Sequence, residues 1–406
     1  MKTTGSIDSN QLPDGNRTAI HALFVIRPPV ESFPPTMHQA NILAEQGFQV
    51  TIACCRKLGL QKAASDLHDA IKRHSLGENF AIHRNFPRRM LEVWQFHRRA
   101  RQLIRRLRPD LVIASDAEGA FAVRSVPREV GVRLVWHFHH NPEDTSRSWS
   151  ATLANRYVHR NARLPDLITN CDASRARIYA REAGIDPKSI LVVANCTRPI
   201  VKVPEPTLRH HLAKVLPDNA RIIMYHGAVG SGHSLKVAVR SIPRWPANSV
   251  FVLKGRAKPD YSNALQELAR RTGVAQRLIL YDPGFQSYDD HYADIAGADV
   301  GWTVFEPDSK NHKYQAMGSN KRFECMALGV PQIGDDNPGA SEFIEGQGFG
   351  LCIPYNSAEA AGAAVSRLLG DEALRKQMAQ RCRELHLSTY NYDRQFEPVV
   401  EAFRRF

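Results

Sequence analysis

The sequence contains no apolar run long enough to cross a membrane. A transmembrane helix needs about 20 consecutive apolar residues, and the apolar runs in these 406 residues are shorter. Residues 1–17 also lack the apolar segment of a secretory signal peptide, and without a hydrophobic period they are expected to form a loose tail. We therefore expect a cytoplasmic protein and leave open its peripheral attachment to the inner face of the membrane.

The common metal-binding patterns are missing as well. The seven cysteines are scattered and contain no Cys-x-x-Cys pair, which argues against a zinc site and against a disulfide framework. The chain also has no Asp-x-Asp pair, the arrangement with which many enzymes hold Mg²⁺ or Mn²⁺ at a nucleotide. We therefore expect no metal and no cofactor, and we expect amides and cationic side chains to hold any phosphate.

Positive charge is concentrated in one stretch of the chain. The formal net charge is +13, and much of it comes from residues 83–110, HRNFPRRMLEVWQFHRRARQLIRRLRPD. A helix over about 89–107 would have arginines around most of its surface and an apolar side made of Leu91, Trp94, Leu103, Ile104 and Leu107. Such a helix suits an anionic membrane surface or another polyanion. An ordinary surface helix packed by its apolar side is the alternative.

Short apolar runs recur along the chain with room for a helix between them. Most of these runs are continuous rather than alternating, as in strands of a parallel sheet covered on both faces. Their order predicts an α/β protein with two doubly wound, Rossmann-like domains facing each other across a cleft. The expected strands cover residues 21–26, 48–55, 111–115, 133–140, 167–171 and 190–196 in the first half, and 221–227, 249–255, 278–284, 299–306, 331–336 and 350–355 in the second.

A proline-rich stretch without a strand pattern separates the two halves. We interpret residues 199–219 as a linker between a first domain, 18–198, and a second domain, 220–385. The carboxyl ends of both sheets would then line the cleft, where α/β proteins bind their ligands.

Two turns of the second half contain groups suited to phosphate. In HGAVGSGHSL, Gly227, Gly230 and Gly232 would let amides at a helix start approach a phosphate. The motif does not match GxGxxG, and a plain strand-to-helix turn is the alternative. In LKGRAKPDY, Lys254 and Arg256 would neutralise a diphosphate in the cleft. Solvated loop charges are the alternative there.

Three histidines end one expected strand of the first half, in WHFHHNPED. Strand alternation places His137 and His139 on one face and His140 on the other. At the carboxyl end of a strand beside a cleft, a histidine can hydrogen-bond a substrate hydroxyl or phosphate. A zinc site is less favoured, because no further His/Cys pair has a matching ligand spacing.

A single carboxylate lies in the apolar run NKRFECMALGVPQIG. Ser319 is expected to cap a helix over residues 320–328, which places Glu324 too far along the helix to serve the cap. An acid here would accept hydrogen bonds from vicinal hydroxyls such as those of a ribose. Pairing with Lys321, three residues earlier, is the alternative.

With these motifs in order, nearly the whole chain resembles the GT-B retaining glycosyltransferases of the family-4 type. The run SNKRFECMALGVPQIGDDNPGASEFI resembles their donor-binding segment. The resemblance implies that Glu324 holds the donor ribose, that Gly227 lies under the nucleotide diphosphate and that His139 lies near the transferred sugar, as the catalytic candidate. It also implies that residues 386–406 form a helix that crosses back to the first domain.

The sequence departs from the family pattern at two places. The commoner family form has a second glutamate where this chain has Ala316, so the resemblance is to a subgroup with Ser/Pro-Asn-Lys, here residues 319–321. The basic pair that follows the glycine loop in the family is missing, and His233 stands at one of its positions. The expected donor-binding residues are Gly227, Gly230, Gly232, Lys254, Arg256, Ser319, Asn320, Lys321 and Glu324.

The resemblance implies a metal-independent transferase that moves a hexosyl group from a nucleotide diphosphate sugar to a hydroxyl acceptor with retention. The acceptor would be a glycan, a lipid-linked molecule or a small molecule, in bacterial cell-surface polysaccharide or glycoconjugate synthesis. Two alternatives stay open: an epimerase or phosphorylase on the same scaffold, and a non-catalytic polyanion binder that uses residues 83–110. Nucleic acid is not the expected partner.

Overall fold

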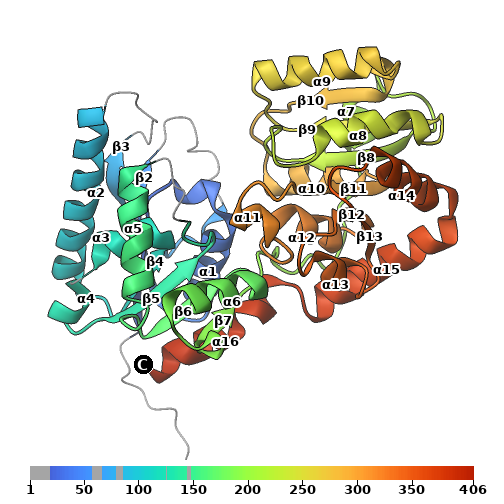
Figure 1. The fold of residues 1–406 in the computed structure, drawn as a ribbon. Coiled ribbons are helices and arrows are strands. Elements are labelled where there is room, and N and C mark those ends of the chain that lie inside the picture. The colour runs from blue at the N-terminus through green and yellow to red at the C-terminus, as the bar shows by residue number, and fades with distance from the viewer. Residues whose placement is uncertain (1–18, 57–65, 79–85, 125, 144–147) are drawn as a thin grey trace, which may run out of the picture.

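The computed structural model describes residues 19–56, 66–78, 86–124, 126–143 and 148–406 (Figure 1). The expected N-terminal tail lies outside these residues. Within them, none of the helices combines the length and the apolar character that crossing a bilayer requires.

Two parallel sheets confirm the predicted fold class. The first sheet has seven strands in the order β3-β2-β1-β4-β5-β6-β7, and the second has six in the order β10-β9-β8-β11-β12-β13. The strands of the first sheet are β1 His21–Ile26, β2 Gln49–Arg56, β3 Lys72–Glu78, β4 Leu111–Ser115, β5 Arg133–Phe138, β6 Leu167–Asn170 and β7 Ile190–Val192. Those of the second are β8 Arg221–His226, β9 Ser249–Lys254, β10 Leu278–Tyr281, β11 Val300–Thr303, β12 Gln332–Asp335 and β13 Gly350–Ile353.

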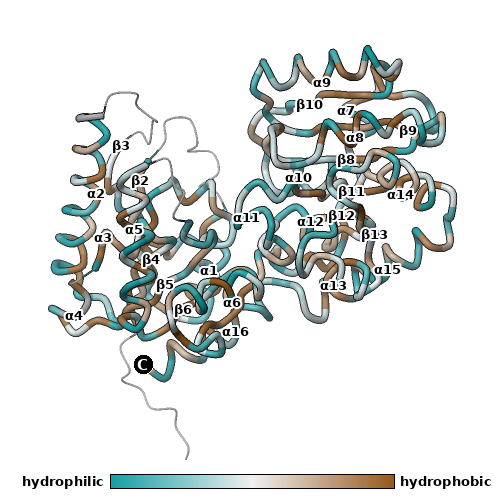
Figure 2. The backbone as a smooth tube through the Cα atoms, viewed as in Figure 1, coloured by the Kyte–Doolittle hydropathy of each residue, from teal (hydrophilic) through white to brown (hydrophobic). Residues whose placement is uncertain are grey.

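Helices connect the strands and cover the sheets, so that each domain has a hydrophobic centre (Figure 2). In the first domain they are α1 Pro34–Glu45, α2 Phe86–Leu107, α3 Asp116–Val123, α4 Val126–Glu129, α5 Trp149–Arg160 and α6 Ala173–Ala183. From the linker onward they are α7 Leu208–His211, α8 Leu235–Ser241, α9 Pro259–Arg271, α10 Tyr288–Ala296, α11 Lys310–Lys313, α12 Asn320–Ala327, α13 Ala340–Ile344, α14 Ala358–Gly370, α15 Glu372–Ser388 and α16 Tyr392–Arg405. Single 3₁₀ turns lie at Val30–Ser32, Pro187–Ser189, Ile242–Arg244 and Ala275–Arg277.

One strand, β3, was not predicted. Its sequence, KRHSLGE, is mostly polar, and Leu76 is its only buried hydrophobic residue. The strand lies at the edge of the sheet, beside β2 alone. An edge strand pairs on one side and needs no continuous apolar run, so the pattern that identified the central strands could not find it.

Strand β5 ends two residues earlier than predicted. After Phe138, the backbone N–H groups of His139 and His140 donate to the carboxylate of Asp116 at 2.8 and 3.0 Å, and not to a neighbouring strand. The residues that follow the strand therefore turn into a loop at the carboxyl edge of the sheet.

The exposed face of α2 corrects a detail of the prediction. Phe96 and Ile104 are buried against the first domain, whereas Leu91 and Trp94 are 51% and 52% exposed. Of the apolar side that the sequence predicted, Leu103 and Ile104 are buried and pack together with Phe96. Leu91 and Trp94 do not take part in this packing, which differs from the alternative of a helix packed by its whole apolar side.

The last helix, α16, lies against the first domain, far from the sheet that precedes it in the sequence (Figure 1). It packs on α1 and β7. The backbone N–H of Tyr392 donates to the carbonyl of Thr197 at 2.8 Å, and Gln39 Nε2 donates to the Tyr392 hydroxyl at 2.8 Å. Phe396 and Phe403 are buried in the same contact. The helix thus ties the end of the chain to the first domain.

Candidate active site

A cavity of about 400 Å³ lies between the two domains, at the carboxyl ends of both sheets. A second cavity, of about 270 Å³, adjoins it and shares Gly227, His291 and Glu324 with it. The first cavity is lined from the first domain by Ser32, Phe33, Pro34, Pro35, His139, His140, Arg175 and Asn195, and from the second by His226, Gly227, His291, Gln315, Gly318, Ser319, Asn320, Lys321 and Glu324.

Several buried polar atoms around the first cavity have no hydrogen-bond partner among the residues that the structure describes. They are Nδ1 of His139, Oδ1 of Asn195, Oγ of Ser319 and Oδ1 of Asn320. Buried polar groups in native proteins are nearly always paired, so a group of unpaired ones calls for an explanation. Because all four residues line one cavity, a polar ligand bound there is the simplest explanation.

The three histidines at the end of β5 and just after it have different surroundings. His137 is buried away from the cavity, with Gln39 Nε2 3.0 Å from its Nε2. His139 lines the cavity, is 3% exposed, and has Thr36 Oγ1 2.9 Å from its Nε2. Burial lowers the pKa of His139 to about 4, so the ring is neutral at pH 7. His140 is more open and lies 3.4 Å from the Asp116 carboxylate.

Glu324 reaches the cavity from α12, whose sequence position agrees closely with the expected helix. Ser319 occupies the N-cap position, but its side chain makes no capping hydrogen bond. Gly329 follows the helix with φ of +71°, a left-handed conformation that favours glycine. Glu324 lies in the middle of the helix and is 8% exposed.

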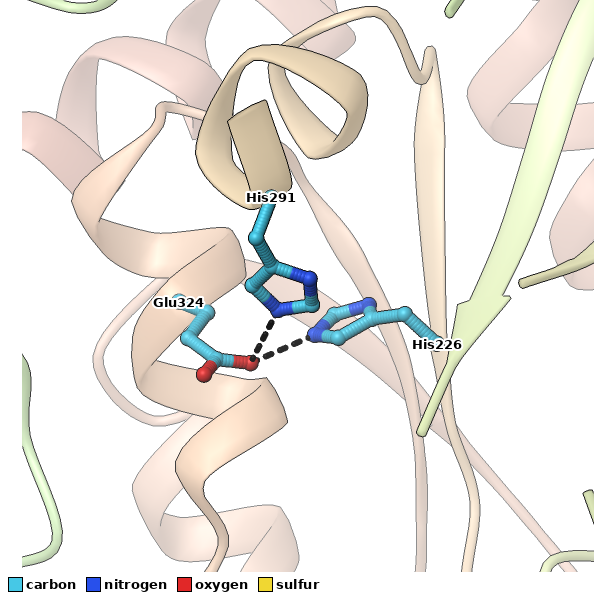
Figure 3. A group of neighbouring side chains, drawn as sticks. All are labelled: His226, His291 and Glu324. Carbon is cyan, nitrogen blue, oxygen red and sulfur yellow. Dashed lines mark hydrogen bonds and ion pairs between the residues drawn. The ribbon is translucent and has the colours of Figure 1, made fainter. Parts of the chain in front are cut away.

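Two histidines contact the Glu324 carboxylate (Figure 3). Oε2 lies 2.7 Å from His226 Nε2 and 3.7 Å from His291 Nε2. Burial alone would raise the pKa of Glu324, but the hydrogen bond from His226 and the nearby His291 ring hold it well below its usual value. Burial lowers the pKa of His226 to about 4. A neutral His226 therefore donates to an ionised Glu324 at pH 7.

Lys321 does not pair with Glu324, because no ion pair between them occurs in the described part of the chain. The Lys321 ammonium instead lies 5.1 Å from the ring centroid of Tyr225 and 4.9 Å from that of Phe305. It also lies over Gly227, where an added Cβ would be 3.8 Å from Nζ. Burial lowers the pKa of Lys321 to about 8. At pH 7 the Lys321 amine is therefore mostly protonated, and no carboxylate of the described residues forms an ion pair with it.

Lys254 and Arg256 are placed differently from what the sequence suggested. The Lys254 ammonium is buried and lies 2.9 Å from the buried carboxylate of Asp294. Arg256 is 85% exposed and is absent from the residues that line either cavity. The structure therefore offers neither residue as an unpaired cation for a diphosphate.

Of the three predicted loop glycines, Gly227 alone lines the cavities. Its φ is +118°, and the neighbouring Gly255 has φ of +136°. A Cβ on Gly255 would lie 2.0 Å from the carbonyl oxygen of Gly227. Glycine at these positions lets the two strand ends approach each other and leaves backbone accessible to a ligand.

The helix start after this loop is not open to a phosphate as expected. The N–H of Ser234 donates to the carboxylate of Glu306 at 3.1 Å. A Cβ on Gly232 would lie 2.6 Å from the His312 ring, so the loop is packed against protein there. The carboxylate of Glu306 fills the place that the prediction assigned to a phosphate.

The sequence reasoning missed Arg175, which joins the two domains. This residue of α6 is 1% exposed. Its guanidinium donates to the carbonyl oxygens of Tyr314 at 2.7 Å and His139 at 3.0 Å, and to Asn311 and Gln315. All of these acceptors are neutral, so the positive charge beside the cavity is not compensated by them. The sequence does contain a signal for this residue, because Arg175 is a charged side chain on the side of α6 that is otherwise apolar and buried.

The sequence reasoning also missed His226 and His291. His226 is the last residue of the buried strand β8, and His139 directly follows the buried strand β5. The argument that selected His139, a histidine at the carboxyl end of a strand, would therefore also have selected His226. His291 lies on α10 and has no such signal. With Glu324, the two histidines place three ligand atoms within 4.8 Å of one another, as a metal site would.

Comparisons with known proteins agree with this geometry. Residues 35–196 match the model of the "Glycosyl transferase 4-like domain", and residues 258–401 match that of a "Glycosyl transferase-like" family. A curated relative, alpha-D-kanosaminyltransferase of Streptomyces kanamyceticus, is 25% identical over 192 residues. That match spans 46% of this chain and 46% of the relative, so the chain spans about half the length of the relative it matches.

Solved structures resemble the whole fold. The Anabaena protein Alr3699/HepE, solved in complex with UDP and glucose, superposes with a TM-score of 0.72 at 14% identity, over 95% of this chain and 100% of that one. A glycosyltransferase from Rickettsia africae superposes with a TM-score of 0.71 at 15% identity, over 96% and 99%. The chain therefore has the GT-B fold, and residues 35–196 and 258–401 are similar to two families of glycosyl transferase domains.

Proposed function

We propose that the protein is a glycosyltransferase that moves a hexosyl group from a nucleotide diphosphate sugar to a hydroxyl acceptor. The observation that carries the proposal is the set of unpaired polar atoms around one interdomain cavity, beside an ionised carboxylate and an unpaired cation. The two glycosyltransferase family models support it. The curated relative is named for glycosyl transfer, and HepE was solved with UDP, which makes UDP the first nucleotide to test.

The ribose, the diphosphate and the sugar of the donor would each have a partner in the cavity. Glu324 has one oxygen without a protein hydrogen bond in the described structure, and this oxygen would accept from the ribose hydroxyls. Lys321 would neutralise the diphosphate over the backbone of Gly227. His139 would donate to or accept from the transferred sugar through its unpaired Nδ1. Ser319 and Asn320 would supply further polar contacts.

Catalysis would depend on positioning and on stabilising the departing diphosphate. In the retaining reaction that we propose, the bond from the anomeric carbon to the phosphate oxygen breaks and a bond to the acceptor oxygen forms on the same face. The leaving phosphate oxygen takes the proton of the acceptor hydroxyl. Neither a metal ion nor a carboxylate acid–base pair is needed for this proton balance. Acceptor recognition would come from first-domain residues such as His140 and Phe33.

The first prediction concerns nucleotide choice. Among UDP-, GDP-, ADP- and dTDP-sugars, we expect one nucleotide to raise the melting temperature by about 5 °C or more at 100 times its Kd, because a ligand that binds only the folded state stabilises it. A thermal-shift panel measures this. The Glu324→Ala variant, which lacks the proposed ribose contact, is the control.

Product analysis separates the two enzyme classes. Incubation with the stabilising nucleotide sugar and no acceptor should leave the sugar unchanged apart from slow hydrolysis. A new epimer would support the epimerase alternative instead. If no nucleotide sugar raises the melting temperature, the proposed function is wrong.

We also propose that α2 attaches the protein to an anionic membrane surface, where lipid-linked or cell-surface acceptors are found. The helix contains seven arginines and one acid. Its exposed face carries Leu91 and Trp94, and the guanidinium of Arg98 lies 5.3 Å from the Trp94 ring. Exposed aromatic and aliphatic side chains among arginines fit the interface of a bilayer with negative charge.

The second prediction tests this attachment with vesicles. The protein should float with vesicles of phosphatidylcholine and phosphatidylglycerol and not with phosphatidylcholine alone, and high salt should release it. The double variant Leu91→Ala/Trp94→Ala should bind at least about tenfold more weakly. Leu387→Ala removes a similarly exposed apolar side chain on α15 and should bind as the wild type does. Equal binding of all three proteins would refute the attachment.

A further inference from the structure

A row of polar side chains, of which Lys254 and Asp294 are buried and His291 is half-buried, leads to the Glu324 carboxylate. Lys254 Nζ lies 2.9 Å from Asp294 Oδ2 and 3.2 Å from His291 Nδ1, and it donates to the His291 carbonyl at 3.2 Å. His291 Nε2 in turn lies 3.7 Å from Glu324 Oε2. Asp294 and Lys254 are 0% and 3% exposed. These four residues come from β9, α10 and α12, so the row exists only in the folded domain.

Lys254 determines which nitrogen of His291 carries the proton. An ammonium group has hydrogen-bond donors and no acceptor. The His291 Nδ1 that faces Lys254 must therefore be the acceptor nitrogen of the ring. A neutral ring in this tautomer carries its proton on Nε2, which is the nitrogen directed at Glu324 (Figure 3).

The same tautomer disfavours a metal at this cluster. His226, His291 and Glu324 have the ligand types of a His₂Glu zinc site, and their ligand atoms lie within 4.8 Å of one another. Zinc at His291 Nε2 would require the proton on Nδ1, where it would point at the Lys254 ammonium. A metal-binding histidine usually donates its other N–H to a carboxylate or a carbonyl. An Nε2–H directed at the Glu324 carboxylate, 3.7 Å away, therefore fits His291 better than metal ligation does.

We propose that Lys254 and His291 are positioning residues that, together with His226, hold Oε2 of Glu324 so that Oε1 is free for the donor. Both histidines approach Oε2, and the second oxygen is turned away from the two rings (Figure 3). Glu324 borders both cavities, so Oε1 has access to a ligand. The inference rests on the proposed function, and it gives Lys254 a role other than the diphosphate cation.

The test compares two substitutions of His291 with a matched control. His291→Leu removes the N–H donor and should raise the donor KM about tenfold while changing kcat less than about twofold, because Glu324 contacts the donor equally in the ground and transition states. His291→Gln keeps an N–H donor and should recover most of the loss. His210→Leu, on the exposed side of α7, should behave as the wild type does.

Two further measurements test the contacts of Lys254, His291 and Glu324 without an activity assay. Nitrogen-15 NMR of the histidine rings should show His291 as the Nε2–H tautomer. Dialysis against Zn²⁺ followed by metal analysis should leave no zinc that depends on His291. The inference would be overturned by an Nδ1–H tautomer of His291 or by stoichiometric zinc that His291→Leu removes. It would equally be overturned if His291→Leu left the donor KM unchanged, or if His291→Gln were as impaired as His291→Leu.

Glu324→Ala separates this inference from the function on which it rests. If Glu324→Ala weakens donor binding and His291→Leu does not, the positioning role fails and the proposed function stands. If neither substitution changes donor binding, the proposed donor site itself is wrong.

Discussion

Replacing Glu324 by alanine is expected to lower the affinity for the nucleotide sugar about 100-fold or more. The carboxylate is ionised and has one oxygen free toward the cavities. Two ribose hydroxyls donating to it would contribute about 1.5–3 kcal/mol each, since hydrogen bonds to charged groups are stronger than neutral ones. Isothermal titration with the nucleotide sugar identified by the thermal-shift panel measures the loss.

A second ligand makes the Glu324 prediction specific to the ribose. The wild type should bind the 2′-deoxy nucleotide more weakly than the ribonucleotide, and Glu324→Ala should bind the two about equally. Glu324→Ala also leaves His226 buried without its partner, so a melting temperature lower by a few degrees is expected. A large fall in melting temperature with unchanged donor affinity would show that Glu324 is structural and does not contact the donor.

Replacing Lys321 by methionine is expected to lower kcat about 100-fold. Lys321 lines the cavity without an acidic partner among the described residues, and it lies against the backbone of Gly227. Removing one group that stabilises charge in a transition state typically costs two to three orders of magnitude in rate. The variant should also lose the preference for the nucleoside diphosphate over the bare nucleoside, which titration of both ligands would show.

The pKa of Lys321 gives this prediction a pH dependence. Burial lowers that pKa to about 8. The amine is charged below this value and neutral above it, and the charged form is the one that binds a diphosphate. The value of kcat/KM should therefore fall as the pH rises through about 8, because this ratio reports the ionisation of the free enzyme.

Lys321→Arg provides the control, because an arginine stays charged throughout this range. Its activity should be lower than that of the wild type, since a guanidinium is larger than the ammonium that lies near the Tyr225 and Phe305 rings. That activity should not fall near pH 8. An alkaline fall that persists unchanged in Lys321→Arg would assign the ionisation to another group and contradict the proposed role of Lys321.

Most of the fold could be predicted because its determinants are local. Parallel strands covered on both faces need continuous apolar runs, and the runs at residues 21–26 and 111–115 coincide with β1 and β4. The helix that carries Glu324 was predicted from its cap position and its terminal glycine, both within a few residues. The edge strand β3 was not predicted, because it has no apolar strand pattern of its own and forms a strand only by pairing with β2.

The site was predicted less completely, and the errors have one cause. The sequence suggested Lys254 as a cation for the donor, but the carboxylate of Asp294 neutralises it. The sequence also suggested a phosphate at the helix start after Gly227, where the carboxylate of Glu306 accepts the hydrogen bond of the backbone amide instead. In both cases a carboxylate distant in the chain takes the place of the expected ligand. The charge of a side chain can be read from the sequence, whereas its neutralisation depends on which partner the fold brings near.

The sequence by itself determined the strands of the two sheets other than β3, the alternation of strands and helices along the chain, and the helix that presents Glu324, because hydrophobic periodicity and helix-end signals act over a few residues. The tertiary structure alone decided which groups surround that carboxylate. His226 is 98 residues from Glu324, and His291 is 37 residues from Lys254. Contacts between such distant residues form when whole strands and helices pack, and no short pattern in the chain encodes them.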